Sequence, residues 1–320
     1  MKIIPLASES LGVRSLACFV ETKELNILID AGVSLGPRFY LLPHPKEYKA
    51  LKRAKSKIRE YAKKAHIISL SHYHLDHYTP TWDFIDTTWT WGSFEEAKKI
   101  YGGKKIFIKD FKRNINPNQR KRGYIFNKMI KDFSYITYCD EKKFEFEDLT
   151  LKFSRALPHG EEGTQLGYVL ALFIKEKDDS MLFCSDTEGP MSDKTLRYFL
   201  RLKPKTLIIS GPPLYLQDFK VRKELIDKGI ENLGKLARKI PTLIVDHHLL
   251  RDERGLEVIN RIKDIGKEHG NRVYTYAEYM GKKNELLECY RAKLYREEPP
   301  LKEFQEWAKS KERLKQLPPL

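Results

Sequence analysis

The sequence has little cysteine, and its four cysteines are widely separated. They are Cys18, Cys139, Cys184 and Cys289, and no two of them form a C-x-x-C pair. This spacing argues against a disulfide framework and against a zinc site made of thiolates. It is typical of reduced, mostly buried thiols, and we therefore expect a cytoplasmic protein.

The sequence also lacks a long apolar run. The N-terminal stretch 1–5 is too short to serve as a signal peptide or a membrane span, and no later stretch reaches the length that a bilayer requires. We therefore expect no membrane partner. With 320 residues and 41% apolar content, the chain can instead bury the core of one large domain or two modest ones.

Acidic residues are outnumbered by basic ones. Lys and Arg total 59 and Asp and Glu total 44, which gives a net charge of +15 and a pI near 9.4. Such a surplus favours anionic partners, such as RNA, DNA or phosphorylated metabolites. The alternative, that the charge only solvates the surface, stays open at this point.

The densest group of chemically reactive side chains lies at residues 71–77, directly after the apolar run 67–70. Three histidines and one aspartate fall within six positions: His72, His74, Asp76 and His77. Side chains two positions apart leave an extended chain on the same side, so His72 and His74 can hold one ion. Asp76 and His77, beyond the bend, can face a second. Because zinc favours imidazole and carboxylate ligands, the segment predicts half of a two-metal site, with zinc as the favoured metal.

This segment resembles the signature H-x-H-x-D-H of the metallo-β-lactamase superfamily. Further segments match that family's other motifs in the expected order, at residues 28–32, 158–160, 183–187 and 245–248. The resemblance extends from the N-terminus to about residue 280, and the chain is similar to uncharacterised archaeal metallo-hydrolases of that superfamily. It implies an α/β fold in which two β-rich halves form a four-layer αββα sandwich.

The resemblance also implies roles for single residues. The implied metal ligands are His72, His74 and His159 for one ion, Asp76, His77 and His247 for the other, and Asp186 as a bridge between the two. His248 remains the alternative to His247. Because adjacent residues on a strand point in opposite directions, we expect only one of these two histidines to bind. Asp30 is expected to bind no metal and to support residues 71–77, here called the ligand loop, through hydrogen bonds.

The chain is expected to divide into a metallo-β-lactamase-like domain at 1–282 and a helical tail at 283–320. Relative to a minimal member of the superfamily, the domain carries an inserted basic segment at about 78–130. Three apolar side chains of the tail are candidates to dock on the body or on a second copy of the chain, which would make a homo-oligomer. They are Phe304, Trp307 and Leu314.

Two local patterns predict helices on either side of the motif. Apolar residues recur with helical spacing across 46–65 among many lysines and arginines, and we interpret the basic face of this helix as its solvated side. Ser93 and Glu96 have the spacing of a capping box, which predicts a second helix that ends at Gly102.

The most distinctive part of the inserted segment is 109–128, where basic, aromatic and amide residues are interleaved. Its candidate substrate contacts are Arg113, Arg120, Lys121 and Arg122. Basic residues follow phosphates and aromatic rings stack on bases, so this composition indicates a contact with nucleic acid or phosphate. Two other interpretations stay open: a lid or oligomer contact, and plain exposed surface.

Together these residues predict a hydrolase. Two divalent ions, zinc by preference, would share a hydroxide nucleophile, with Asp76 and Asp186 as the catalytic carboxylates. The net charge slightly favours a phosphodiester or nucleic-acid substrate. The alternatives are a small ester, thioester or lactone hydrolase and a non-catalytic nucleic-acid-binding module. Whether Glu188 assists catalysis stays open.

Overall fold

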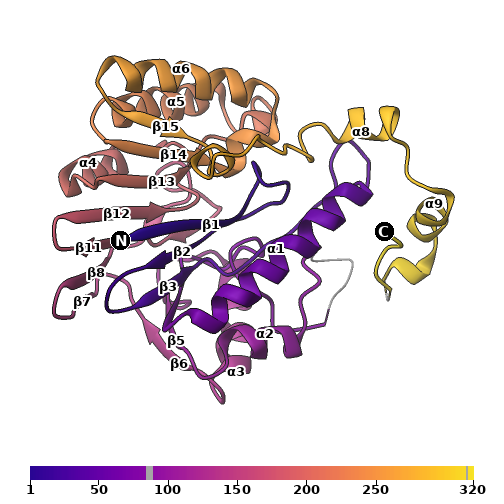
Figure 1. The fold of residues 1–320 in the computed structure, drawn as a ribbon, viewed down its shortest axis with the longest axis horizontal. Coiled ribbons are helices and arrows are strands. Elements are labelled where there is room, and N and C mark those ends of the chain that lie inside the picture. Colours follow the sequence, from indigo (N-terminus) through magenta and orange to yellow (C-terminus); the bar gives the residue numbers. More distant parts are fainter. Residues whose placement is uncertain (84–88, 315) are drawn as a thin grey trace.

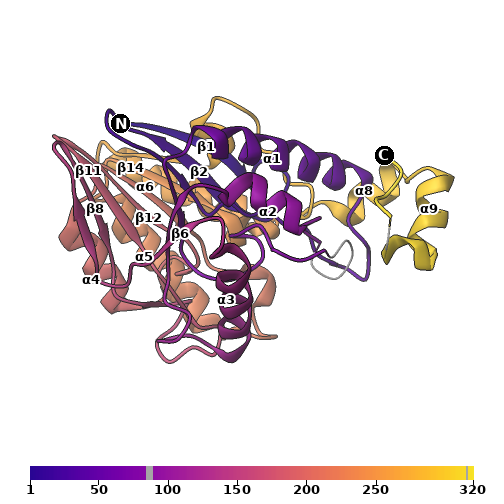
Figure 2. The ribbon, with the colours of Figure 1, turned by 90° about the horizontal axis from the view of Figure 1, so that it is seen from below.

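Two β-sheets face each other, and helices cover the outer surface of each (Figures 1 and 2). This computed structural model describes residues 1–83, 89–314 and 316–320, without the side chains of 312 and 314. Part of the predicted insertion, residues 84–88, and the predicted docking side chain of Leu314 therefore lie outside what is described.

The first sheet begins with an antiparallel meander and continues with parallel strands. Its strands are β1 (Lys2–Ser8), β2 (Leu16–Glu21), β3 (Asn26–Ile29), β4 (Ile67–Leu70), β5 (Lys105–Ile108) and β6 (Tyr135–Tyr138), paired in that order. From β3 onwards the pairing is parallel, because a helix connects each strand to the next.

The second sheet has seven strands in the order β15-β14-β13-β12-β11-β8-β7. They are β7 (Lys143–Glu145), β8 (Leu149–Phe153), β11 (Leu172–Glu176), β12 (Asp179–Cys184), β13 (Thr206–Ser210), β14 (Thr242–Asp246) and β15 (Arg272–Tyr274). Strands β7 to β12 pair antiparallel, and β12 to β15 pair parallel. A separate pair joins β9 (Leu157–Pro158) to β10 (Tyr168–Val169).

Helices connect the parallel strands and form the two outer layers. On the first sheet these are α1 (Pro45–Lys64), α2 (Phe94–Tyr101) and α3 (Pro117–Ile130), and on the second α4 (Asp193–Leu202), α5 (Lys223–Ala237) and α6 (Arg254–Glu268). Shorter elements are α7 (Tyr276–Tyr279), α8 (Arg291–Glu297), α9 (Lys302–Lys309) and the 3₁₀ helices η1 (Leu214–Leu216), η2 (His247–Arg251) and η3 (Lys311–Leu314). Within the described residues, no helix combines the length and apolar character that crossing a bilayer would need.

Three apolar cores separate the four layers. On β3, Ile29 faces the core between the sheets, whereas Leu28 faces the core under the first helix layer. On β13, Ile208 faces inward and Leu207 faces the second helix layer. Neighbouring residues thus alternate between two apolar environments, as in strands buried on both faces. The predicted four-layer αββα sandwich is confirmed, and the four cysteines are free and buried as expected.

The predicted helix at 46–65 is present as α1, offset by one residue at each end. A capping box starts it: the His44 ring accepts a hydrogen bond from the backbone of the first turn, and the Glu47 carboxylate accepts one from the backbone of His44. Tyr48 and Leu51 lie on its buried face.

Only half of the capping box predicted at Ser93 and Glu96 forms. The Ser93 hydroxyl accepts a hydrogen bond from the backbone N–H of Glu96 and so begins α2. The Glu96 carboxylate pairs instead with the Arg59 guanidinium of α1 at 2.9 Å. This tertiary ion pair replaces the local contact because α1 and α2 pack side by side on the same sheet.

The segment predicted as an insertion and the tail both pack on the first half of the chain. Strand β5 lies between β4 and β6, so this segment is built into the sheet. In the tail, the rings of Phe304 and Trp307 lie 6.0 and 5.8 Å from that of Tyr48 on α1. The tail therefore docks on the body of its own chain, while the domain boundary near 282 stays a prediction.

Candidate metal centre

Strands of both sheets end at a common edge of the sandwich. In the first sheet β1, β3 and β4 point in the same direction, and in the second β12, β13 and β14 do. Just beyond these strand ends lie Glu9, Asp30, the segment 71–77, Asp186 and His247. Residues far apart in sequence therefore meet outside the carboxyl ends of the strands, where α/β sheets usually place their sites.

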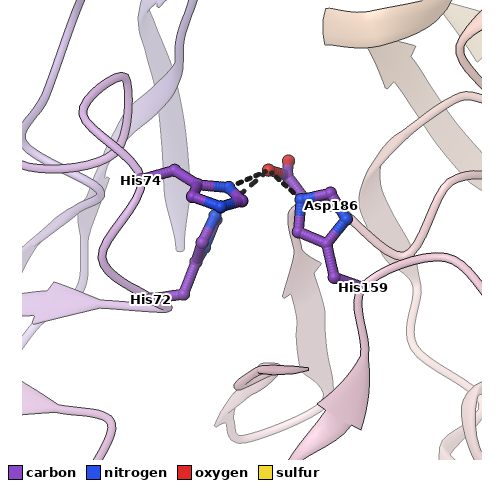
Figure 3. A group of neighbouring side chains, drawn as sticks. All are labelled: His72, His74, His159 and Asp186. Carbon is purple, nitrogen blue, oxygen red and sulfur yellow. Dashed lines mark hydrogen bonds and ion pairs between the residues drawn. The ribbon is translucent and has the colours of Figure 1, made fainter. Parts of the chain in front are cut away.

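Asp186 lies at the centre of the residues predicted for the first ion. Its Oδ2 atom is 3.1 Å from Nε2 of His72, 3.1 Å from Nε2 of His159 and 3.8 Å from Nδ1 of His74. Figure 3 shows His72 and His74 on one side, facing His159 and Asp186 on the other. One ligand atom from each of the four residues lies within 4.8 Å of the others.

The residues predicted for the second ion gather around the same carboxylate. Oδ2 of Asp186 is 3.2 Å from Nε2 of His77, and Oδ1 is 3.3 Å from Nε2 of His247. Asp76 lies 3.8 Å from the first of these nitrogens and 3.6 Å from the second. Asp186 therefore takes part in both groups, which is the position of a carboxylate that bridges two cations.

Several polar atoms at this centre are buried without a partner. Nε2 of His72, His77 and His247 and Oδ1 of Asp186 have no hydrogen-bond partner among the described residues. Their neighbours lie close but not in hydrogen-bonding geometry. Orphaned buried polar atoms are rare because they cost free energy, and bound cations are one way to satisfy them. The donor set thus fits divalent metal ions.

Each of these three histidine rings is oriented through its other nitrogen. The Nδ1 atoms lie 2.8 Å from Ser71 Oγ for His72, Asp30 Oδ2 for His77 and Glu9 Oε2 for His247. A ring fixed in this way by a neighbouring oxygen keeps its second nitrogen aimed at a cation.

Asp30 holds the ligand loop through hydrogen bonds to Ser71. Its Oδ1 accepts a hydrogen bond from the Ser71 backbone at 2.8 Å, and its Oδ2 accepts one from the Ser71 hydroxyl at 2.7 Å. Because that hydroxyl gives its hydrogen to Asp30, it accepts from Nδ1 of His72 and leaves Nε2 with a free lone pair. Both Asp30 oxygens thereby accept hydrogen bonds from the 71–77 loop, as predicted for a supporting residue. Asp30 also forms a possible metal-binding group with His72 and His77, so that it binds no metal stays a prediction.

Glycine at position 32 is what lets the ligand loop lie so close to β3. A Cβ atom at Gly32 would collide with the backbone of Tyr78, directly after His77. The aspartate and the glycine of the 28–32 motif therefore serve the same loop, one by hydrogen bonds and one by leaving space.

Glu9 and Arg251 belong to the centre although Glu9 was not among the predicted residues. The Glu9 carboxylate accepts hydrogen bonds from Nδ1 of His247 at 2.8 Å and from Nε of Arg251 at 2.6 Å. Nη2 of Arg251 is 3.3 Å from Oδ2 of Asp76, and Nη1 donates to the Tyr215 hydroxyl. Glu9 follows a strand end just as Asp30 does, and this is the signal that could have found it.

His247 and His248 both enter the centre, and the reason given for excluding one of them is wrong. Strand β14 ends at Asp246, and His247 opens the 3₁₀ helix η2 with a φ of +69°. Strand alternation therefore does not apply. The two rings stack with centroids 4.2 Å apart, and Nε2 of His248 lies 4.0 Å from Asp186. His247 is closer to the bridging carboxylate, and which of the two binds stays open.

Glu188 is buried behind the histidines. Its Oε1 atom is 3.4 Å from Nδ1 of His159 and 3.6 Å from Nδ1 of His248. Burial alone would raise the pKa of Glu188, but its contacts with the two histidines hold that pKa at about 2. Burial and the neighbouring His247 lower the pKa of His248 to about 4. Glu188 therefore stays ionised and lies close to both rings, without a hydrogen bond to either Nδ1 atom.

Helix α3 reaches the centre through an amide that sequence reasoning passed over. Nε2 of Gln119 lies 3.2 Å from Nε2 of His74, and Oε1 of Gln119 accepts a hydrogen bond from the backbone of Tyr73. The contact fixes the His74 ring with Nδ1 facing Asp186. The signal was present in segment 109–128, where only the basic and aromatic residues were given a role.

The predicted substrate contacts do not enter the centre. Arg113 is 84% exposed, Arg120 and Lys121 are exposed, and Arg122 lies part-buried near the Tyr73 carbonyl at 3.5 Å. They lie on or just before α3, whose first turn adjoins the ligand His74. Their role in substrate binding stays a prediction.

No family model matches this chain. The known proteins similar to it are relatives in sequence and solved structures with a similar fold. A UPF0282 protein of Korarchaeum cryptofilum is 40% identical over 309 residues, which cover 96% of this chain and 99% of that protein. Unliganded yeast PDE1 superimposes with a TM-score of 0.50 at 13% identity, over 85% of this chain and 96% of PDE1.

A second solved structure, Tm1679, is described as a metal-dependent hydrolase of the β-lactamase superfamily. It superimposes with a TM-score of 0.47 at 12% identity, over 85% of this chain and 94% of Tm1679. At such identities a structural match speaks for the fold alone.

Proposed function

Because this chain belongs to the UPF0282 family and has the metallo-β-lactamase fold, we propose from its site that it is a metal-dependent hydrolase with a dinuclear centre. The family name states no activity, so the site carries the proposal. The observation that supports it most is Asp186, whose carboxylate belongs to both groups of histidines.

Zinc is the metal that this donor set fits best. The ligands we propose are His72, His74, His159 and Asp186 for one ion, and Asp76, His77, His247 and Asp186 for the other. Imidazole nitrogens and carboxylate oxygens, without thiolates, are typical of catalytic zinc sites. When bound, two such ions would supply Lewis-acid chemistry: they would lower the pKa of a coordinated water and neutralise charge that develops on the substrate.

The chain's own residues orient the ligands and move the proton. Asp76 is the carboxylate that we expect to take up a proton at Oδ1, because Arg251 anchors its other oxygen at 3.3 Å. Glu9 holds Arg251 in place and also orients His247. Glu9, His247 and Arg251 are buried, which keeps bulk water from their contacts and strengthens them, whereas Asp76 is partly exposed.

We favour a phosphodiester, as in RNA or DNA, as the substrate class. The net charge of +15 and the exposed cations of α3 support an anionic substrate. Arg113, Arg120, Lys121 and Arg122 remain the proposed contacts. An ester, thioester or lactone hydrolase would use the same centre, and a substrate panel separates these classes.

Metal analysis of the purified protein, combined with that panel, tests the proposal. We expect two zinc ions per chain and turnover of a phosphodiester that is lost after chelation and restored by zinc. Turnover of a thioester or lactone alone would shift the substrate class. A metal-free protein with full turnover would end the proposal.

His74→Ala tests the ligand assignment. We expect lower metal content and a loss of turnover of about a hundredfold or more, with the fold retained, because a ligand is lost without opening the core. His269→Ala is the matched control, since His269 is exposed at the end of α6. Unchanged metal stoichiometry and turnover in His74→Ala would refute the assignment.

A further inference from the structure

The outer face of α3 carries a stripe of cations with an aromatic ring inside it. Residues 111–131 contain seven lysines and arginines and no carboxylate: Lys112, Arg113, Arg120, Lys121, Arg122, Lys128 and Lys131. Helical spacing of three and four places Lys121, Tyr124, Lys128 and Lys131 along one line. All four are exposed, and within the described residues none of the three lysines has a carboxylate partner.

A groove of about 530 Å³ lies between this stripe and the edge of the first sheet. Figures 1 and 2 show α3 beside β6, the last strand of that sheet. Phe111, Ile136 and Tyr138 form its apolar part, and Tyr124, Lys128 and Lys131 border it. Tyr124 is 54% exposed, with its ring centroid 6.2 Å from that of Phe111. The groove thus offers an accessible ring over an apolar floor with cations beside it.

The same helix connects this groove to the metal centre. Gln119, in the first turn of α3, contacts the ligand His74, and Asn116 caps the helix and donates to the carbonyl of Leu166. From Gln119 to Lys131 the helical rise amounts to about 18 Å. A chain molecule that reaches from the centre to the groove has to cover about this distance along the helix.

We propose that this groove binds a base of a single-stranded nucleic acid by stacking on Tyr124, while Lys121, Lys128 and Lys131 contact the adjoining phosphates. The proposal rests on the proposed function and deepens it by naming where the substrate extends. A single strand is favoured over a duplex because only unpaired bases present a free face to an aromatic ring. The absence of carboxylates along 111–131 supplies the charge complementarity.

Binding of labelled oligonucleotides tests the groove without requiring turnover. We use a short fluorescent oligouridylate, checked for intactness, and an abasic oligomer with the same number of phosphates. The wild-type protein is expected to bind the oligouridylate more tightly than the abasic oligomer. Tyr124→Ala should weaken oligouridylate binding about tenfold and remove most of the preference. Tyr135→Ala, which removes a tyrosine that is 71% exposed outside the groove, should change neither.

The cations are tested through the salt dependence of binding. Lys128→Glu with Lys131→Glu should reduce the slope of log affinity against log salt by about 1.4, since each lost phosphate contact contributes about 0.7 for single strands. Lys239→Glu with Lys267→Glu, which reverses two exposed lysines that do not line the groove, is the matched charge control. Unfolding temperature and metal content of each variant show whether it has folded.

Equal affinity for the two oligomers, or unchanged binding by folded Tyr124→Ala, would overturn the proposal. So would binding to vesicles of acidic lipid that depends on Lys128 and Lys131 when oligonucleotides do not bind. Tyrosine-dependent binding without any hydrolysis would refute the proposed hydrolase function and support the proposed binding groove. Phosphodiester turnover without oligonucleotide binding would support the hydrolase function and refute the binding groove.

Discussion

Helices α1 and α3 are both rich in cations and both cover the first sheet, yet they use their charge differently. On α1, Lys46, Arg53, Arg59 and Lys64 each pair with a carboxylate. Two of those carboxylates, Glu298 and Glu285, come from the tail. On α3, by contrast, no ion pair involves a residue of the helix among the described residues.

The difference shows that net charge by itself does not identify a binding surface. The cations of α1 fasten the tail and α2 to the body, so part of the +15 charge serves the fold. The lysines of α3 are left to solvent, next to a groove and to the candidate metal centre. The interpretation of the basic face of α1 as merely solvated is thus incomplete, because several of its cations are structural. The predictions below test this contrast, from the largest expected effect on stability to the smallest.

The largest effect is expected where α1 meets the tail in the core. Arg291 and Glu47 are fully buried and joined by two hydrogen bonds of 2.7 Å. Arg291→Met leaves the Glu47 carboxylate buried and unpaired, so we expect the free energy of unfolding to fall by about 3–5 kcal/mol in denaturant titration. The double variant with Glu47→Gln should recover much of this loss. A loss under about 1 kcal/mol in the single variant would contradict the structural role.

The next effect is a pH dependence at the start of the tail. Burial alone would raise the pKa of Glu288, but Arg14, which donates two hydrogen bonds of 2.6 Å, holds it at about 2. A carboxyl whose folded pKa is depressed stabilises the protein above its unfolded pKa of about 4.3 and loses that contribution as pH falls towards 2. We expect about 3 kcal/mol of stability to disappear over this window.

Denaturant titrations of wild-type protein and Glu288→Gln between neutral pH and pH 2 measure this contribution. The variant should be less stable at neutral pH and should converge with the wild type at pH 2. Parallel pH profiles in the two proteins would show that the pair with Arg14 contributes nothing.

A smaller effect is expected at the contact between α1 and α2. The Arg59 guanidinium is 40% exposed and pairs with Glu96, which is 8% exposed. Solvent screens the exposed partner, so Arg59→Ala should cost about 1 kcal/mol of unfolding free energy. Lys63→Ala, an exposed lysine of the same helix, should change stability by less than that. Equal effects of the two variants would mean that the ion pair adds nothing.

The smallest effect on stability is expected on α3. Lys121→Ala and Lys128→Ala remove exposed side chains, so each should leave the free energy of unfolding within about 0.5 kcal/mol of wild type. The same variants should weaken binding of the oligouridylate. A stability loss comparable to that of Arg59→Ala would place these lysines in the same structural class as the cations of α1 and erase the contrast.

Much of the candidate metal centre could be predicted because the residues that form it follow strands. Residues 71–77 are contiguous, and period-two geometry relates His72 to His74 before any tertiary structure is known. Asp30 and Asp186 follow apolar strands in recognisable motifs. The prediction about His247 and His248 depended on a strand continuing for one more residue. Because a 3₁₀ helix begins at His247, the alternation of side chains along a strand does not apply to these two residues.

What the sequence alone could not supply were contacts between polar side chains on separate elements. Glu9 and Arg251 are 242 residues apart, and Gln119 and His74 are 45 apart. Such pairs produce no repeating pattern in the sequence, because one hydrogen bond constrains only the two residues that form it. That the cations of α3 lack carboxylate partners likewise became visible only in the structure, because it requires the position of every neighbouring carboxylate.

The amino-acid sequence determined the layers and most of the residues that meet at the candidate metal centre, since apolar alternation and strand-end motifs are local consequences of backbone geometry. Only the tertiary structure decided which charges are neutralised, which rings are held by which oxygens, and that both histidines after β14 reach the same carboxylate. Those outcomes depend on how separate elements pack, and packing brings residues together irrespective of their distance along the chain.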